Sequence, residues 1–363
     1  METKMKKEIE QIKSDIKNFT PASKERTEFI SSGSTLLNLA LSQKGIHGGF
    51  ARNRIINIVG DGSSGKTLLA LETAHWVFRN IKKIKSKLFP SVKEVKIAYI
   101  NRERVMDFPI EKMYGQDFVN AVEWRYDIAT VEEFGRYFGR LALEHKENEC
   151  LIVILDSWDS LNSEAGQERF KQAALKDESP DGSYKTEKAA YASKEFFNNA
   201  CDLMTGKDIT LFIISQTRTK IGITFGEKHY RSGGDALNFY THQVPWLAEI
   251  EKLKKTFKGE TRVYGVRTLA KIKRNKVAKP FRQAESIILF DYGIDNISSM
   301  INYLWGPKAS KIEFDGYIFK NREEFIGYIE ENDLEDELSN MCEDQWAEIE
   351  EAMVPERKRK YVS

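Results

Sequence analysis

Apolar and amphipathic segments alternate along the chain between about residues 30 and 300. Four of the apolar segments contain no charged residue apart from Lys96, and they read IINIV, VKIAYI, LIVIL and TLFII. Such runs are typical of strands buried on both faces, and the helical segments between them imply right-handed crossovers. The pattern therefore predicts an α/β fold, with a mostly parallel sheet between helices, over residues 30–300.

The N-terminal segment has a helical pattern of its own. Apolar residues recur three or four positions apart among Lys and Glu, at Ile9, Ile12, Ile16 and Phe19. We expect residues 1–29 to form an amphipathic helix and a linker. The spacing fits packing on its own domain as well as on a neighbouring subunit. We adopt the subunit interface as the interpretation.

Two further segments depart from the alternation. Residues Gln167–Lys194 are polar, with Pro180, Asp181 and Gly182 at their middle, which predicts an exposed loop. Residues 301–363 are acidic with interleaved apolar residues and end in a basic tail. They predict a small acidic, α-rich C-terminal domain.

Composition narrows the class of protein without naming a function. The chain has 363 residues, of which 41% are hydrophobic, enough for a substantial core. Three cysteines without paired spacing predict neither disulfides nor a zinc site, and no apolar run has the length of a membrane span. We expect a soluble cytoplasmic protein. Because the net charge is only +1, nucleic-acid binding would depend on local basic loops.

A glycine-rich motif follows the first apolar run and precedes a helical segment. It matches G-x-x-x-x-G-K-[ST] and comprises Gly60, Asp61, Gly62, Ser63, Ser64, Gly65, Lys66 and Thr67. Backbone N–H groups of such a loop surround the β-phosphate of a nucleotide, and the helix dipole favours the negative charge. Lys66 is expected to reach the β- and γ-phosphates and Thr67 to bind Mg²⁺. The motif predicts a site for ATP and Mg²⁺. The helix that follows the motif is expected to begin near Leu68.

Polar residues directly follow the other apolar runs. In an open parallel sheet the carboxyl ends of the strands meet at one edge, where ligands bind. We expect Asp156 to hold Mg²⁺, Glu103 to polarise a hydrolytic water, and Gln216 to sense the γ-phosphate. Each of them would otherwise serve as a helix cap or a solvated side chain.

The stretch SQTRTKIGITFGEKHYRSGGDALNFY, residues 215–240, resembles the second DNA-binding loop and following helix of the bacterial RecA family. The resemblance extends to residues 31–41, 60–67, 98–103, 153–157 and 273–285. It implies a RecA-like P-loop NTPase core and an ATP-dependent recombinase that forms helical filaments on single-stranded DNA. The implied partners are single-stranded DNA, a homologous duplex, further copies of the chain, and single-strand-binding or loader proteins.

The resemblance also assigns roles that spacing alone does not. Gln216 would couple the γ-phosphate to the DNA loop, Phe239 would pack at the subunit interface, and Arg274 and Lys276 would reach the ATP of a neighbouring subunit. Asp107 matches an adenine-contacting position. The residues expected to contact DNA are Arg218, Lys220, Gly222, Phe225, Arg231, Gly233, Gly234 and Lys271.

Several positions differ from the pattern of that family. Asn101 stands where an Asp is usual, Arg104 follows the catalytic Glu, and Ile110 replaces the expected aromatic residue. Leu269 replaces an arginine that would hold a second DNA strand, beside the matching Lys271. The alternative function is therefore an ATP-switched DNA-binding filament or scaffold without strand exchange. A ring-forming motor is a third, less favoured interpretation.

Overall fold

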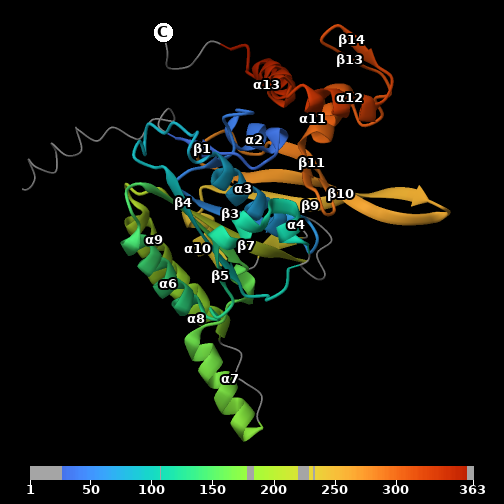
Figure 1. The fold of residues 1–363 in the computed structure, drawn as a ribbon. Helices are drawn as coiled ribbons and strands as arrows, with labels where there is room; N and C mark the ends of the chain where they lie inside the picture. The colour runs from blue at the N-terminus through green and yellow to red at the C-terminus, as the bar shows by residue number, and fades with distance from the viewer. Residues whose placement is uncertain (1–26, 107, 178–183, 220–228, 232–233, 358–363) are drawn as a thin grey trace, which may run out of the picture.

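The computed structural model describes residues 27–106, 108–177, 184–219, 229–231 and 234–357. Its centre is a large sheet with helices on both faces (Figure 1). The sheet has the order β12-β11-β10-β9-β3-β7-β6-β4-β5, with β8 paired to β7. The strands are β3 (Ile55–Gly60), β4 (Glu94–Asn101), β5 (Val122–Arg125), β6 (Glu149–Asp156), β7 (Ile209–Thr219), β8 (His229–Arg231), β9 (Gln243–Phe257), β10 (Glu260–Asn275), β11 (Gln283–Leu289) and β12 (Gly293–Asp295).

The central strands are parallel, as the buried apolar runs predict. Each of β5, β4, β6, β7, β3 and β9 is parallel to its neighbour, whereas β9 to β12 form an antiparallel meander. Alternate residues of β6 enter two separate cores: Ile152 and Ile154 pack on one face, Val153 and Leu155 on the other. The predicted fold class is confirmed.

Helices cover both faces of the sheet. On one face α2 (Thr35–Ser42) and α3 (Lys66–Asn80) contribute to the core, and on the other α6 (Val131–Glu144) and α9 (Phe197–Met204) do so. The shorter helices are α4 (Ile110–Tyr114), α5 (Gln116–Ala121) and α10 (Gly234–Tyr240). A two-stranded sheet of β1 (Phe29–Ile30) and β2 (Phe50–Ala51) precedes β3. Within the part of the chain that the structure describes, none of the helices has the length and apolar character that a membrane crossing needs.

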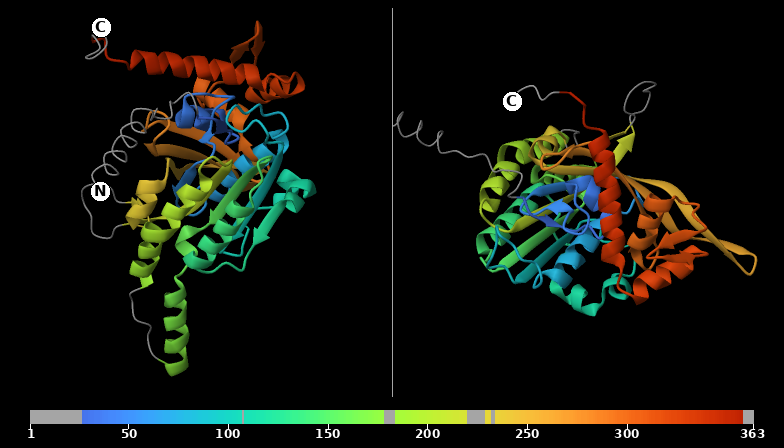
Figure 2. Two further views of the ribbon diagram at one scale, coloured as in Figure 1. Left: turned by 90° about the vertical axis from the view of Figure 1, so that its left-hand side faces the viewer. Right: turned by 90° about the horizontal axis from the view of Figure 1, so that it is seen from above.

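The sequence predicted an exposed loop at Gln167–Lys194. For the residues of this segment that the structure describes, the prediction is wrong. They form α7 (Glu164–Lys176), which extends away from the body of the protein, α8 (Tyr184–Tyr191) and a π-helical turn (Ala192–Phe196) that continues into α9 (Figures 1 and 2). Ser163 caps α7 by accepting a hydrogen bond from the Gly166 N–H. Residues 164–176 are mostly strong helix formers. Few of them are apolar, so the hydrophobic pattern did not indicate a helix.

The C-terminal part is predominantly helical and is docked on the core. It contains α11 (Asn296–Trp305), α12 (Arg322–Glu331), α13 (Glu335–Ala352) and a hairpin of β13 (Ile312–Phe314) and β14 (Tyr317–Phe319). Helix α13 crosses α2 (Figure 2) and buries Leu338 and Cys342 in the same core cluster. Glu343 accepts a hydrogen bond from the Gly45 N–H at 2.7 Å. The acidic residues of this part therefore also serve in docking. The division at residue 301 stays a prediction.

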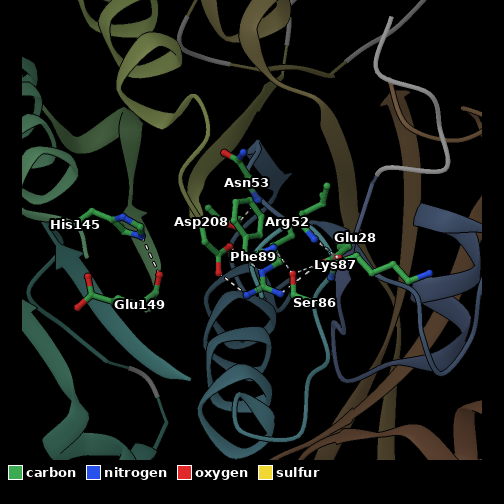
Figure 3. A network of polar contacts seen from close by, with 11 residues as sticks. Glu28, Arg52, Asn53, Ser86, Lys87, Phe89, His145, Glu149 and Asp208 are labelled. Carbon is green, nitrogen blue, oxygen red and sulfur yellow. Dashed lines mark hydrogen bonds and ion pairs between the residues drawn. The ribbon is translucent and has the colours of Figure 1, made fainter. Parts of the chain in front are cut away.

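A buried ion pair joins elements at the amino ends of the parallel strands (Figure 3). Arg52, which precedes β3, donates through Nε at 2.8 Å and through Nη2 to the two carboxylate oxygens of Asp208, which precedes β7. Both side chains are at most 2% exposed. Glu28 accepts a third hydrogen bond from Arg52 and further ones from Ser86 and Lys87. This network fixes the loop before β4 at the amino ends of the parallel strands. The glycine-rich motif lies at the carboxyl ends of the same strands.

Candidate functional site

The residues that follow the central strands meet at one edge of the sheet. Gly60 at the end of β3 is paired with Gln216 of β7, and Asn101 at the end of β4 is paired with Asp156 of β6. The sheet register therefore brings the glycine-rich motif, the Glu103 loop and the Gln216 segment together.

The glycine-rich motif forms a tight loop between β3 and α3. The helix begins at Lys66, two residues before the predicted start. Gly65 has φ 85°, and a Cβ added there would lie 2.5 Å from Ile288 Cδ1. A side chain at this position would therefore be both strained and crowded. The Lys66 ammonium donates to the Asp61 carbonyl across the loop, and burial lowers the pKa of Lys66.

Two oxygen atoms suited to a hard cation lie beside this loop. Thr67 Oγ1 donates to Asp156 Oδ2 at 2.6 Å, and the Tyr99 hydroxyl donates to the same oxygen at 2.6 Å. Burial raises the pKa of Asp156, and these two hydrogen bonds partly offset the effect. A carboxylate and a hydroxyl in contact are the donor set that Mg²⁺ prefers. Tyr99 gave no signal in the sequence, because it belongs to a buried apolar run.

Glu103 and Gln216 are in direct contact. Gln216 Nε2 donates to Glu103 Oε1 at 3.0 Å, and Ser157 Oγ donates to the same oxygen at 3.2 Å. The Gln216 N–H donates to Asp159 Oδ2 at 2.6 Å. The Glu103 carboxylate, at the carboxyl ends of the strands, is thus hydrogen-bonded to Gln216, in the part of β7 that leads to β8. Ser157 and Asp159 were missed, although they directly follow the strand that ends at Asp156.

Asn101 organises the loop that carries Glu103. Its Oδ1 accepts a hydrogen bond from the Arg104 N–H at 2.8 Å, and its Nδ2 donates to the Val105 carbonyl at 3.0 Å. A carboxylate could make the first bond but not the second, since it has no N–H to donate. The amide at this position therefore fits the backbone of this loop.

A cavity of about 630 Å³ extends from the phosphate loop. Lys66, Thr67, Glu103 and Asp156 are among its polar lining residues. Its apolar and aromatic lining residues include Met106, Phe108, Met113, Ile288 and Phe290, and Ile288 lies beside Gly65 of the phosphate loop. Asp107 lies outside the described residues, and Ile110 does not line the cavity. Phe108 and Phe290 were missed, although Phe290 directly follows the strand β11.

The residues expected at a subunit interface lie together on another surface. The Lys276 ammonium donates to the Phe239 carbonyl at 2.8 Å and lies 5.9 Å from the centre of its ring. Phe239 is 68% exposed. Burial and the neighbouring Arg274 lower the pKa of Lys276. None of these three described residues lines the cavity of its own chain.

The expected DNA-contacting residues are only partly within the described chain. Residues 217–219 of β7 pair with residues 229–231 of β8, so Arg218 and Arg231 belong to one hairpin, and Gly234 begins α10. Lys220, Gly222, Phe225 and Gly233 lie outside the described residues. Lys271 is exposed on β10, opposite Gln283, and two strands separate β10 from β7. Lys271 is therefore not brought to the hairpin.

Comparison with known sequences finds one protein family. The family described as the RecA N-terminal domain matches residues 3–84 and 173–295. Protein RecA of Rippkaea orientalis is 29% identical over 333 residues, which cover 88% of this chain and 83% of that protein. Protein RecA of Synechocystis sp. is 29% identical over 319 residues, covering 86% and 79%. A crystal structure of the RadB recombinase aligns with a TM-score of 0.46 and 17% identity over 73% of this chain and 98% of that one.

Proposed function

Because this chain belongs to the RecA family, we propose that it is an ATP-dependent recombinase that polymerises on single-stranded DNA in the cytoplasm. In this proposal it pairs the bound strand with a homologous duplex and releases DNA after ATP hydrolysis. The observation that carries it is the hydrogen bond between Gln216 and Glu103. This bond connects the nucleotide edge of the sheet to the β7–β8 hairpin.

The residues of the cavity fit ATP with Mg²⁺. Lys66 and the backbone N–H groups of the phosphate loop would bind the phosphates, and the contacting oxygens of Thr67 and Asp156 would hold the cation. Phe108 and Phe290 offer flat faces for the base. The bound cation would neutralise charge on the phosphates.

In this proposal Glu103 acts as the general base. It would orient and deprotonate the attacking water, while Ser157 and Gln216 hold its carboxylate. A γ-phosphate at this edge would compete with Glu103 for the amide of Gln216. A change of partner at Gln216 would shift the start of the hairpin, and in this way nucleotide state would reach the DNA-binding segment.

Arg274 and Lys276 would complete the site of the next subunit. They do not line their own cavity, and they lie beside the exposed Phe239. Cations supplied in trans neutralise charge that develops on the γ-phosphate, so hydrolysis would depend on assembly.

Electron microscopy with single-stranded DNA tests the proposal. We expect helical filaments with a non-hydrolysable ATP analogue and Mg²⁺, and their loss without nucleotide. Binding should weaken steeply with salt, because contacts to phosphates dominate such affinity. Closed rings, or a chain that stays monomeric on DNA with every nucleotide, would contradict the proposal.

One observation favours a second candidate, a filament that binds DNA without exchanging strands. In the RecA family pattern a basic residue stands at the position of Leu269, two residues before Lys271 on β10. The surface around Lys271 therefore carries less positive charge to hold a second DNA strand. A joint-molecule assay with homologous and heterologous duplexes separates the two functions. Joint molecules that form with the homologous duplex alone support the recombinase.

A further inference from the structure

The strands β9 and β10 continue past the sheet as a two-stranded ribbon, residues 252–264. Leu247 of β9 pairs with Gly60 at the carboxyl end of β3, and β9 continues for ten further residues to Phe257. Figures 1 and 2 show the end of this ribbon projecting from the body of the protein. The β7–β8 hairpin lies past the same edge of the sheet, because Gly60 also pairs with Gln216. Two hairpins therefore extend beyond one edge.

The ribbon is strongly basic, although the whole chain has a net charge of only +1. Glu260 is its one acidic residue, and its five cationic residues are Lys252, Lys254, Lys255, Lys258 and Arg262. Arg262 Nη2 lies 3.5 Å from Glu260 Oε2, and Lys252 Nζ lies 3.8 Å from Oε1 of Glu249, just before the ribbon. The other three lysines form no ion pair within the part of the chain that the structure describes. Their charge is available to an anionic partner.

The register of the ribbon places two cations directly opposite each other. Lys255 on β9 pairs with Arg262 on β10, so both side chains lie on one face. Like charges in directly opposed positions of an antiparallel pair destabilise it. An anion bound by both side chains would remove this repulsion and add charge-assisted hydrogen bonds. The pairing thus indicates a partner that carries negative charge.

Apolar side chains are exposed on the same ribbon. Phe257 is 71% exposed near its tip and is two residues from Lys255, which places both on one face. Tyr264 on β10 is exposed as well. Lysines that only protect an exposed strand from aggregation would stand without such neighbours. Cations beside an aromatic residue fit DNA, and the major groove of a duplex admits a two-stranded ribbon.

We propose that the ribbon binds the phosphates of duplex DNA through Lys254, Lys255 and Lys258, a role that rests on the proposed function, in which a homologous duplex is the second DNA partner. This site is separate from Lys271. Lys271 pairs with Trp246, and Lys255 lies about 30 Å further along β9 at the rise of a strand. The ribbon supplies positive charge for the duplex that the surface around Lys271 lacks.

The experiment measures the affinity of full-length protein, with a non-hydrolysable ATP analogue, for a labelled duplex over a range of salt concentrations. The glutamine variant carries Lys254→Gln, Lys255→Gln and Lys258→Gln. It should bind the duplex more weakly at low salt and lose affinity less steeply as salt rises. The slope of log affinity against log salt should change by about 2.7, because each phosphate contact contributes about 0.9.

Two further variants separate local charge from other effects. Arginine at the three ribbon positions preserves the charge and should keep the wild-type slope. The matched control makes the same change of charge at exposed lysines after α3, which are Lys82→Gln, Lys83→Gln and Lys85→Gln. It should also keep the wild-type slope. Thermal unfolding checks that each variant folds, and if the glutamine variant does not, Lys255→Gln alone decides, with an expected change of about 0.9.

Equal slopes for wild type and the folded glutamine variant overturn the inference. An equal loss of slope with labelled single-stranded DNA overturns the assignment to a duplex. Loss of filaments with unchanged duplex affinity would show that the ribbon contacts a second copy of the chain, and this outcome also overturns it. Wild-type protein that shows the expected slopes but forms no filaments on single-stranded DNA would contradict the proposed function and still support the duplex contact of the ribbon.

Discussion

For single residues, position at the end of an apolar run predicted which side chains meet at one edge of the sheet. The pattern led us to expect Glu103, Asp156 and Gln216 there, and the structure places the first and third in hydrogen-bond contact at the same edge as the second. The catalytic roles of these residues stay predictions. The pattern gives no signal for polar groups inside an apolar run, such as the hydroxyl of Tyr99. It also fails for partners distant in sequence, such as Arg52 and Asp208, which only the fold brings together.

Glu103→Gln tests the role of the carboxylate beside Gln216. The amide preserves the size of the side chain but cannot take a proton. We expect filaments to form with ATP, while hydrolysis falls by about a hundredfold or more, the usual contribution of a general base. A phosphate-release assay with single-stranded DNA measures the rate. Glu111→Gln, an exposed glutamate of α4, is the matched control and should keep wild-type turnover. Undiminished hydrolysis in Glu103→Gln would remove this residue from the mechanism.

Glu72 on α3 provides a prediction about pH. Burial raises its pKa to about 7 from an ordinary 4.5, against the opposing hydrogen bond from Tyr114. The folded state therefore favours the protonated carboxyl, and this contribution to stability is lost as pH rises from 4.5 through 7. We expect Glu72→Gln to increase the free energy of unfolding by about 2 kcal/mol at pH 8 and to have little effect at pH 4.5.

Urea unfolding of both proteins at the two pH values measures this difference. Glu348→Gln, at an exposed position of α13, should show no such dependence on pH. A Glu72→Gln protein with the same stability difference at both pH values would show that the carboxyl does not titrate as described.

For secondary-structure elements, the apolar runs predicted the buried central strands. Exposed polar elements were predicted less well, because they contain no such runs. Helix α7 was missed because its residues are polar on most sides. The long antiparallel pair β9 and β10 was also beyond the pattern. Its distal half is exposed and rich in Lys and Glu, and the two strands remain paired along it. Exposed elements of this kind carry little hydrophobic periodicity to detect.

Asp208→Asn tests the buried ion pair at the amino ends of β3 and β7. Removal of one charge leaves the guanidinium of Arg52 buried without its full partner. We expect a loss of about 3 kcal/mol in the free energy of unfolding, seen as a lower urea midpoint. Glu164→Gln removes an exposed pair with Arg136 and should cost less than about 1 kcal/mol. Equal effects of the two substitutions would contradict the importance of burial.

For the whole molecule, the proposed catalytic groups occupy two separate surfaces. The phosphate loop and Glu103 line the cavity, while Arg274 and Lys276 lie with Phe239 elsewhere. The sequence could assign this separation only through the family resemblance, because spacing does not show which residues act on a neighbour. Because β10 is antiparallel to β9, its last residues Arg274 and Asn275 lie beside the first residues of β9, at the edge of the sheet opposite the phosphate loop.

A mixing experiment tests whether catalysis is shared between subunits. Lys66→Ala disables the cavity, and Arg274→Ala with Lys276→Ala disables the cations. We expect each variant alone to hydrolyse ATP poorly on DNA. An equimolar mixture should recover up to about a quarter of wild-type turnover, the share of contacts that pair an intact cavity with intact cations. Turnover of the mixture equal to the mean of the two separate proteins would contradict shared catalysis.

The nucleotide cavity and the Arg274 and Lys276 pair lie on different surfaces of one chain. A head-to-tail filament of such chains would therefore have two unlike ends. If catalysis is shared between subunits as proposed, one terminal subunit would keep an uncovered nucleotide, and the other would present Arg274 and Lys276 without a neighbouring nucleotide to contact. The uncovered nucleotide would turn over slowest, so growth and shrinkage need not occur at the same end. Very short arrays should hydrolyse less per subunit than long ones.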